Sequence, residues 1–255
     1  RQHGLGSVTV TGVSDEQGMA YLQQLKAAGY QGAVPESIQQ GGSYRLGMDQ
    51  TRLQIRYAGT TLSVEMTLMG ETRRVMTDEE LAQLNEWLCG YRAEANNVAH
   101  ATPVNGFFLS SYENVRDLDF VDFLAYFPGE AGEITETEFQ ALKALDNWPF
   151  DKETLAEMPV PIHRIPAKTL DATLQEYAGI TTADLWDRSG VCYLPETDAY
   201  YTFTSDFGPG YFQADYGETT GDDAWLWYGS DCLTLGRETD GWKIRSYQGP
   251  WEAMP

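Results

Sequence analysis

Aromatic side chains and carboxylates are concentrated in residues 190–236, and both groups can bind sugars or cations. Aromatic rings stack on sugar faces and on cations, while carboxylates accept hydrogen bonds from hydroxyl groups. Residues 189–236 contain no Lys, Arg or His, so no neighbour in sequence neutralises these carboxylates. The aromatic and acidic members are Tyr193, Tyr200, Tyr201, Phe203, Phe207, Tyr211, Phe212, Tyr216, Trp225, Trp227 and Tyr228, with Glu196, Asp198, Asp206, Asp215, Glu218, Asp222, Asp223 and Asp231.

The most specific pattern in this stretch is the run Trp225-Leu226-Trp227. Side chains alternate along a strand, so Trp225 and Trp227 share one face with Asp223, and Leu226 lies on the other. If the Leu226 face packs on the core, the two indoles form an outward platform for a sugar or a protein; if the indole face is the core, there is no platform. Both interpretations stay open. The predicted ligand-binding residues are Trp225, Trp227, Asp223, Tyr200 and Asp206.

A pair of carboxylates is the remaining route to catalysis. Glycosidases use one protonated and one ionised carboxyl group, and Asp198, Asp206, Asp222 and Asp223 lie near aromatic strands. However, Asp206 and Asp222 adjoin glycine-rich turns, where aspartate commonly bonds its own backbone. The sequence therefore favours binding, predicts no catalytic residue, and keeps a carboxylate-dependent glycan hydrolase as an alternative.

Other common chemistries lack their motifs. The three histidines have no metal-ligand spacing, and the chain has no His-Glu-x-x-His helix, Gly-x-Ser-x-Gly turn or phosphate-binding Gly-Lys-Ser/Thr loop. The acidic segment 117–122 lacks the glycine of a calcium loop. We therefore predict no metal and no cofactor. Cys89, Cys192 and Cys232 leave two options open, a Cys192–Cys232 disulfide or three small buried thiols.

The charge distribution indicates two domains and limits the partners. Residues 1–70 hold five basic and five acidic residues, so residues 71–255 carry the whole net charge of −21. This step predicts a boundary near Gly70, between a module at 1–70 and an acidic domain at 71–255. Strong acidity repels nucleic acid and anionic membranes, and no apolar run is long enough to cross a bilayer. A glycan or a protein remains as the expected partner.

The order of predicted elements indicates an α+β fold. Residues 7–11 predict a strand, Ser14 begins a helix, and 41–47, 51–57 and 61–68 predict a three-stranded meander. Helices followed by an antiparallel sheet characterise the α+β class. The acidic domain is expected to contain helices at 77–94, 117–127, 135–145 and 166–178, a buried strand at 104–110, and an antiparallel sheet over 191–247 with strands at 198–205, 211–216, 224–228, 232–235 and 242–246.

Several runs after residue 76 resemble secreted or lipid-anchored proteins of Gram-positive anaerobic bacteria. They are 77–81 (TDEEL), 104–112 (VNGFFLSSY), 165–166 (IP), 177–180 (YAGI), 198–201 (DAYY) with 205–206, 233–235 (LTL) and 240–244 (DGWKI). The last hairpin is also similar to those of NTF2-like and cystatin-like α+β proteins. This resemblance implies a compartment and a fold class, and it assigns no functional residue. The lipid-attachment Cys of such proteins is absent at the start of this sequence.

Together these patterns predict a non-enzymatic extracytoplasmic binding or interaction module that recognises glycan or cell-envelope material. The sequence begins with Arg1 and has no charged-then-apolar leader, which is typical of a mature form from which a targeting segment has been removed. The alternatives are the glycan hydrolase and a structural component of the cell envelope. A structural component would expose a large apolar patch and form oligomers.

Overall fold

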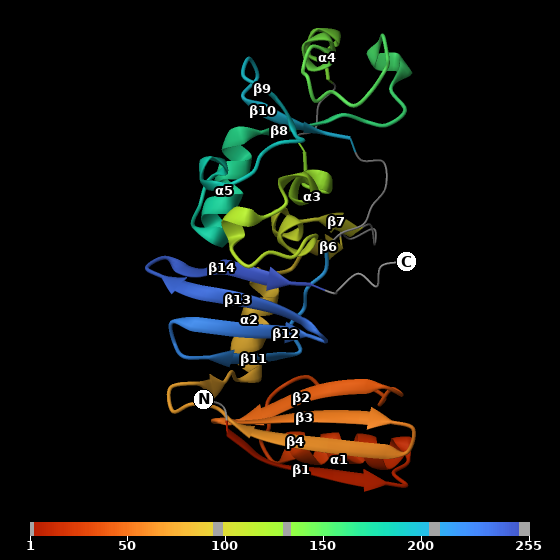
Figure 1. Ribbon diagram of the computed structural model, residues 1–255, viewed down its shortest axis with the longest axis vertical. Helices are drawn as coiled ribbons and strands as arrows, with labels where there is room; N and C mark the ends of the chain where they lie inside the picture. The colour runs from red at the N-terminus through yellow and green to blue at the C-terminus, as the bar shows by residue number, and fades with distance from the viewer. Residues whose placement is uncertain (1–2, 94–98, 130–133, 204–209, 250–255) are drawn as a thin grey trace. The chain divides into compact units, whose positions relative to one another are not determined.

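The computed structural model describes residues 3–93, 99–129, 134–203 and 210–249 (Figure 1). The chain forms two compact units, and each is built from two separate stretches of sequence. Unit 1 comprises Arg1–Trp87 and Gln213–Thr239, and unit 2 comprises Leu88–Phe212 and Asp240–Pro255. Helices and antiparallel sheets occur in both, which confirms the α+β class. The units do not divide at residue 70, because residues 213–239 return to the N-terminal part of the chain.

Unit 1 begins with a four-stranded antiparallel sheet in the order β1-β4-β3-β2 (Figure 1). The predicted strand, helix and meander at 7–68 are confirmed, and β1 pairs with the last strand of the meander. Alternation sends Leu53, Ile55 and Tyr57 to one face, and all three are buried. The elements are β1 (His3–Thr11), α1 (Asp15–Ala27), β2 (Gly42–Met48), β3 (Thr51–Ala58) and β4 (Thr61–Leu68).

Helix α1 covers the apolar face of this sheet. It begins at Ser14, whose hydroxyl accepts a hydrogen bond from the Gln17 amide at 3.2 Å, while the Gln17 side chain accepts one from the Ser14 amide at 3.0 Å. This reciprocal cap satisfies two backbone donors that the first turn leaves free. Leu22 of α1 is fully buried against Ile55 and Tyr57. Burial of a side chain of this size stabilises the fold by about 1.5–3 kcal/mol.

The rest of unit 1 is a second antiparallel sheet with the order β13-β12-β11-β5. The predicted strand at 211–216 is wrong, because β11 covers Tyr216–Thr219. Gly217 lies inside that strand, where an added Cβ would be 2.8 Å from the Met76 sulfur and 3.1 Å from Leu226. The glycine thus permits close packing rather than marking a turn. The elements are β5 (Arg74–Val75), α2 (Asp78–Trp87), β11 (Tyr216–Thr219), β12 (Asp223–Tyr228) and β13 (Asp231–Glu238).

Helix α2 begins as predicted but is shorter. The Thr77 hydroxyl accepts from the Glu80 amide at 3.1 Å, and the Glu80 carboxylate accepts from the Thr77 amide at 2.8 Å. The helix ends at Trp87, not at residue 94. Gly90 follows, and a Cβ there would lie 2.8 Å from the Gly210 carbonyl oxygen. After this glycine the chain continues as a short strand, residues 91–93, instead of the predicted helix.

Unit 2 contains short helices, a hairpin and a three-stranded sheet of order β8-β10-β9. The single sheet predicted over 191–247 is therefore wrong for its first two strands, since β9 and β10 pair with each other and β10 also pairs with β8 in this separate sheet. The elements are β6 (Tyr91–Ala93), β7 (Ala99–Ala101), α3 (Phe120–Ala125), α4 (Glu136–Lys143), β8 (His163–Pro166), α5 (Ala167–Ala178), β9 (Cys192–Leu194), β10 (Ala199–Thr202) and β14 (Gly241–Gln248), with 3₁₀ helices at Pro103–Phe108, Val115–Asp117, Leu155–Glu157 and Thr182–Asp184.

Two predictions in unit 2 need correction. The predicted strand at 104–110 is a 3₁₀ helix, Pro103–Phe108, which begins with a proline that cannot donate a ladder hydrogen bond. The predicted helix at 117–127 is α3, Phe120–Ala125. It begins after Asp119, whose carboxylate accepts hydrogen bonds from the amides of Val121 and Asp122, both at 3.0 Å. An aspartate at this position caps the helix and fixes its start.

The remaining helices of unit 2 follow their sequence signals. Helix α4 begins at the predicted cap Thr135, and α5 ends at Gly179, which has a left-handed φ of 68°. Pro166 directly precedes α5, and its ring prearranges the backbone for the first turn. The predicted linking loop at 149–166 is only partly irregular, because it contains the 3₁₀ helix Leu155–Glu157 and the strand β8.

The Glu138 carboxylate of α4 links three elements of unit 2. One oxygen accepts from the Thr135 amide at 2.9 Å and the Thr135 hydroxyl at 2.8 Å. The other accepts from the Arg164 guanidinium at 3.0 Å and the Tyr201 hydroxyl at 3.1 Å. Burial alone would raise the pKa of Glu138, but these hydrogen bonds outweigh it and hold the pKa at about 2.

Unit 2 should therefore lose stability in mild acid through Glu138. The folded pKa lies below the unfolded value of about 4.3, so the stabilisation is complete above about pH 4.3 and is lost as the pH falls toward 2. We expect Glu138→Gln to lower the urea midpoint at neutral pH and to flatten its decline between about pH 5 and about pH 3. Glu136→Gln, on the same helix and exposed, is the control. An equally steep decline in Glu138→Gln would refute this assignment.

Candidate functional site

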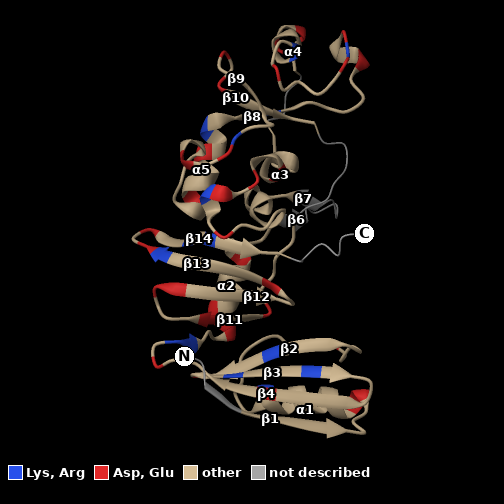
Figure 2. Cartoon of the chain, viewed as in Figure 1, with Lys and Arg blue, Asp and Glu red and all other residues tan. Residues whose placement is uncertain are grey.

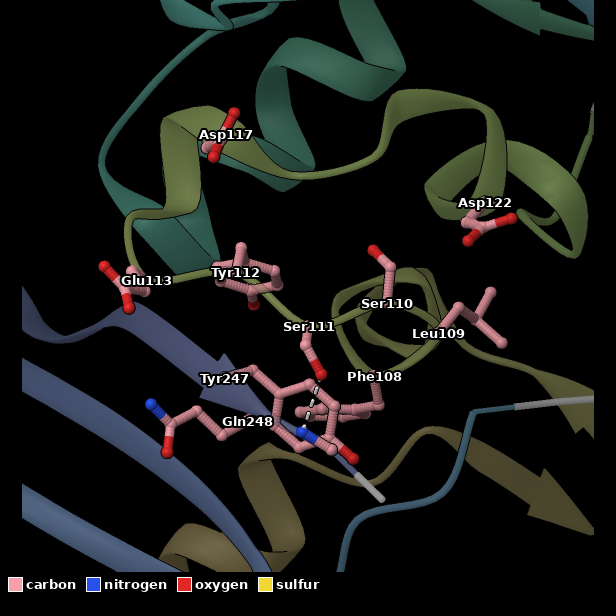
Figure 3. A pocket seen from close by; sticks show the side chains of 11 residues that line it. Phe108, Leu109, Ser110, Ser111, Tyr112, Glu113, Asp117, Asp122, Tyr247 and Gln248 are labelled. Carbon is pink, nitrogen blue, oxygen red and sulfur yellow. Dashed lines mark hydrogen bonds between the residues drawn. The ribbon is translucent and has the colours of Figure 1, made fainter. Parts of the chain in front are cut away.

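Unit 2 contains a cavity of about 700 Å³ between the segment 108–122 and the end of β14 (Figure 3). The two sides are far apart in sequence and are joined by an isolated antiparallel bridge between Tyr112 and Tyr247. The Tyr112 amide donates to the Tyr247 carbonyl at 2.8 Å, and the reverse bond measures 3.0 Å. The lining residues are Phe108, Leu109, Ser110, Ser111, Tyr112, Glu113, Asp117, Asp122, Tyr247, Gln248 and Gly249.

Buried aromatic rings form the floor of this cavity. Phe108 stacks on Phe212 with a centroid distance of 5.5 Å, and both meet the edge or face of Tyr247 at 5.6 and 5.9 Å. Tyr112 lies 6.4 Å from Tyr247. Edge-to-face and offset contacts of this kind are favourable beyond the area that they bury. The floor is thus a packed, rigid surface rather than a set of exposed rings.

The wall of the cavity carries hydroxyl and carboxylate groups. The Ser111 hydroxyl accepts a hydrogen bond from the Gly249 amide at 3.0 Å, drawn as a dashed line in Figure 3. The Ser110 hydroxyl oxygen is buried and has no hydrogen-bond partner among the residues that the structure describes, and it points away from the aromatic floor (Figure 3). Glu113, Asp117 and Asp122 are exposed at the surface. Among the described residues, no Lys, Arg or His lines the cavity.

Tyr112 cannot exchange protons in this cavity near neutral pH. Burial raises the pKa of its phenol well above the usual value, and the neighbouring Tyr247 raises it further. Its hydroxyl donates to the Phe107 carbonyl oxygen at 3.1 Å. Tyr112 therefore positions the backbone of the segment 107–112, and the carboxylates remain as the acid or base groups of the lining.

The structure resolves the question of the 225–227 strand in part. Leu226 is fully buried on one face of β12, whereas Trp225 and Trp227 are half-buried on the other. Two arginines from other parts of unit 1 cover the indoles. The Arg73 guanidinium lies 3.8 Å from the Trp225 ring centroid, and Arg45 lies 5.6 Å from that of Trp227. The indole face is thus neither core nor an open platform, because cations already occupy it.

Glu218 pairs with Arg73 and with a further arginine, Arg52. Its carboxylate is fully buried and lies 3.2 Å from Arg52 and 2.6 Å from Arg73, as a close ion pair rather than an aligned hydrogen bond with Arg73. The Tyr216 hydroxyl donates to it at 3.1 Å. Arg45 lies on β2 and Arg52 lies on β3, and the basic residues of both strands are blue in Figure 2. Glu218 of the acidic stretch is therefore paired with arginines that are distant in sequence.

The other predicted site residues lie elsewhere. Tyr200 is buried in β10 of unit 2, where its ring contacts Phe120 at 5.2 Å and Tyr193 at 4.8 Å. It belongs to a different unit from Trp225 and Trp227. Asp223 is exposed at the start of β12, on the indole face. Asp206 lies outside the described residues.

The carboxylates that the sequence offered as candidate catalytic groups are also divided between the two units. Asp198 closes the turn between β9 and β10 with a left-handed φ of 48° and accepts a hydrogen bond from the Tyr193 hydroxyl at 2.8 Å. Asp222 belongs to unit 1, where its carbonyl oxygen accepts from the Arg237 amide at 2.7 Å. Asp198 thus shapes a turn that the sequence did not predict, and Asp222 lies next to Gly221 between β11 and β12.

The cysteines are free thiols. Burial raises the pKa of Cys192 to about 11, and burial also raises the pKa of Cys232. Both thiols are therefore protonated and poorly nucleophilic at neutral pH. Within the described part of the chain, no three His, Cys, Asp or Glu side chains gather to form a metal site, and none of the helices there has the length and apolarity needed to cross a membrane.

Sequence reasoning missed the cavity. Its two serines and Tyr112 fall in the run 110–112, which begins at the end of the predicted buried strand, and its second side comes from β14, including Tyr247. A weak signal existed, since Ser-Ser followed by Tyr-Glu is polar for a core strand. With the geometry described, comparison with known proteins adds no relative: no family model, curated protein or solved structure matches this chain.

Proposed function

We propose that this protein is a non-enzymatic extracytoplasmic binding module that holds a neutral, hydroxyl-rich ligand, such as a glycan or a fragment of cell-envelope material, in the cavity of unit 2. The observation that carries the proposal is the lining itself. A cavity of about 700 Å³ has hydroxyl and carboxylate groups above an aromatic floor, and the described part of its lining contains no basic side chain. Pockets of this size commonly bind small molecules.

The chemistry of the lining supports a hydroxyl-rich ligand. Glu113, Asp117 and Asp122 supply acceptors for hydroxyl donors, and they disfavour anionic ligands by repulsion. The buried Ser110 hydroxyl has no hydrogen-bond partner among the described residues of the free protein. A buried polar group without a partner costs free energy that a ligand can recover by supplying one.

Ser110→Ala should therefore separate binding from stability. We expect the variant to keep or slightly raise the free energy of unfolding, because it removes an unpartnered hydroxyl. Its affinity should fall about tenfold, the equivalent of one hydrogen bond. Calorimetric titration with soluble glycans and cell-wall fragments measures the affinity, and Ser37→Ala, an exposed serine of unit 1, is the control. Flat titrations for the unmodified protein across both ligand sets would end the proposal.

The indole face of β12 is the second location to test. Trp225 and Trp227 are covered by Arg73 and Arg45, but both rings remain partly exposed. If the ligand binds in the cavity, Trp225→Ala leaves its affinity unchanged and Ser110→Ala lowers it. If the ligand instead stacks on the indoles, Trp225→Ala lowers its affinity and Ser110→Ala leaves it unchanged.

A glycan hydrolase is the second candidate function, and the three carboxylates around one cavity favour it. Hydrolysis would need one of Glu113, Asp117 and Asp122 as acid and another as nucleophile or base. Incubation with the same glycans, followed by a reducing-end assay, distinguishes turnover from binding. Hydrolysis that is lost in Asp117→Asn would establish the enzyme and overturn the non-enzymatic proposal.

The extracytoplasmic location and an envelope role belong to the same proposal. Acidity and the resemblance of residues 77–244 to secreted proteins support the location. Fractionation of the source cells with an antibody against the protein tests it directly. Recovery with the cytoplasmic fraction would contradict both the location and the envelope ligand.

A further inference from the structure

The outer edge of β1 is the unprotected end of the first sheet. In the order β1-β4-β3-β2, one edge of β1 pairs with β4, and no described residue pairs with the other. The opposite end of the sheet differs, because Gln31 bridges to the outer side of β2. The Gln31 amide donates to the Gly47 carbonyl at 2.7 Å, and the Gly47 amide donates back at 3.0 Å.

The free edge is also apolar. Val8 is 62% exposed and Val10 is 48% exposed. Val10 pairs with Leu62 of β4, and Leu62 pairs in turn with Tyr57 of β3. Both Leu62 and Tyr57 belong to the core under α1. Directly paired residues share a face of the sheet. The two valines therefore extend the core face beyond the part that the rest of unit 1 covers.

Devices that usually protect an edge strand are missing over most of β1. Proteins place Lys, Pro, inward-pointing charges or bulges on free edges to prevent strand addition. The range His3–Thr11 contains no Lys, Arg, Asp, Glu or Pro, and β1 is drawn without a charged residue in Figure 2. Its one irregularity falls between Gly4 and Gly6. Ser7–Thr11 remains a regular strand of alternating valine and hydroxyl side chains.

We propose that the occupant of this edge is a second copy of the chain, added as an antiparallel β1–β1 pair that joins two sheets into one. Charge favours this partner and this place. The net charge of −21 lies entirely in residues 71–255, so two copies repel each other over most of their surface. Residues 1–70 sum to zero and carry the free edge. A two-fold interface places the same patch on both copies, which an antiparallel strand pair satisfies.

The valines select the register of this pair. With Thr9 on the two-fold axis, Val8 of each copy lies opposite Val10 of the other. Directly opposed residues of antiparallel strands have Cβ atoms about 4.5–5.5 Å apart, so four valines form one apolar seam. Backbone hydrogen bonds then supply affinity and the seam supplies specificity. This inference stands apart from the ligand site, which lies in unit 2.

Sedimentation velocity over a dilution series of the whole chain tests the dimer. We expect a monomer–dimer equilibrium in the unmodified protein. Val10→Lys should raise the dimer dissociation constant at least about tenfold, because it sets like charges into the seam. Val121→Lys is the matched control, since Val121 is also 48% exposed but lies on α3. A monomer at every concentration, or a dimer that Val10→Lys leaves intact, overturns the proposal.

Cross-linking tests the register independently of any loss of affinity. Thr9→Cys should form a disulfide-linked dimer on mild oxidation, because the two residues meet at the axis. Ser43→Cys, exposed on β2 at the other end of the sheet, should form no disulfide-linked dimer, and it also reports any linkage through the native thiols. Equal cross-linking of the two variants would overturn the β1–β1 arrangement.

Discussion

Replacing Glu218 by alanine is expected to destabilise the protein by about 3–5 kcal/mol. The carboxylate is fully buried between Arg52 and Arg73, whose side chains are mostly buried too. Its loss leaves two guanidinium groups facing each other without the anion that neutralises them. The penalty comes from these stranded charges more than from the loss of favourable pairing. The Tyr216 hydroxyl also loses its acceptor.

Urea unfolding measures this cost, and the chain offers a surface pair for comparison. Lys143 and Glu153 approach to 2.8 Å, but the Glu153 side chain is 84% exposed. Glu153→Ala should leave the urea midpoint nearly unchanged, because water screens the pair. Arg73 also stacks on Trp225, so Glu218→Ala should change tryptophan fluorescence in the folded state. A similar cost for the two variants would show that Glu218 does not hold the arginines.

Sequence patterns predicted the elements of this fold where the determining contacts are local. Ser14, Thr77 and Thr135 all cap helices as predicted, since a cap depends on residues three positions apart. The meander of unit 1 was likewise predictable from alternation and a tight turn. These interactions close within a few residues, so a linear pattern contains them.

Errors arose where a glycine packs against a distant segment. Gly217 resembles a turn residue, yet it lies inside β11 beneath Met76. Gly90 follows the end of α2, and a Cβ there would meet the backbone at Gly210. A sequence does not state whether a glycine is needed for its φ or for its missing side chain. The predicted boundary near Gly70 also differs from the two compact units. Residues 213–239 belong to the same unit as residues 1–87, although they lie far from them in sequence.

The sites were harder to predict than the fold. Trp225 and Trp227 form a recognisable pattern, but Arg45 and Arg73, which cover them, lie more than a hundred residues earlier. The cavity of unit 2 joins the segment 108–122 to the end of β14. No spacing within the sequence relates such groups. The absence of basic residues from 189–236 is thus a property of the sequence alone. In the folded protein, Arg45 and Arg73 lie against the indoles of this stretch.

Gly106→Ala is expected to cost about 3 kcal/mol, at the upper end of the usual penalty for overpacking. An added Cβ would lie 2.4 Å from the Phe123 carbonyl oxygen and 2.5 Å from its ring. A flexible side chain could yield to such a contact, but the backbone of α3 is fixed by its cap at Asp119. The 3₁₀ helix Pro103–Phe108 must move instead. Phe107, fully buried against Phe123 at a centroid distance of 5.0 Å, would move with it.

The displacement should reach the cavity, since Phe108 follows in the same 3₁₀ helix and forms part of the floor. We therefore expect Gly106→Ala to lower the urea midpoint and to weaken binding of any cavity ligand, whereas Ser110→Ala weakens binding alone. Gly70→Ala is the matched control, because no atom lies within 4 Å of its added Cβ; restricting the unfolded chain there should leave stability unchanged or raise it by up to about 1 kcal/mol. Equal stability of the two alanine variants would mean that the 3₁₀ helix does not rest on α3.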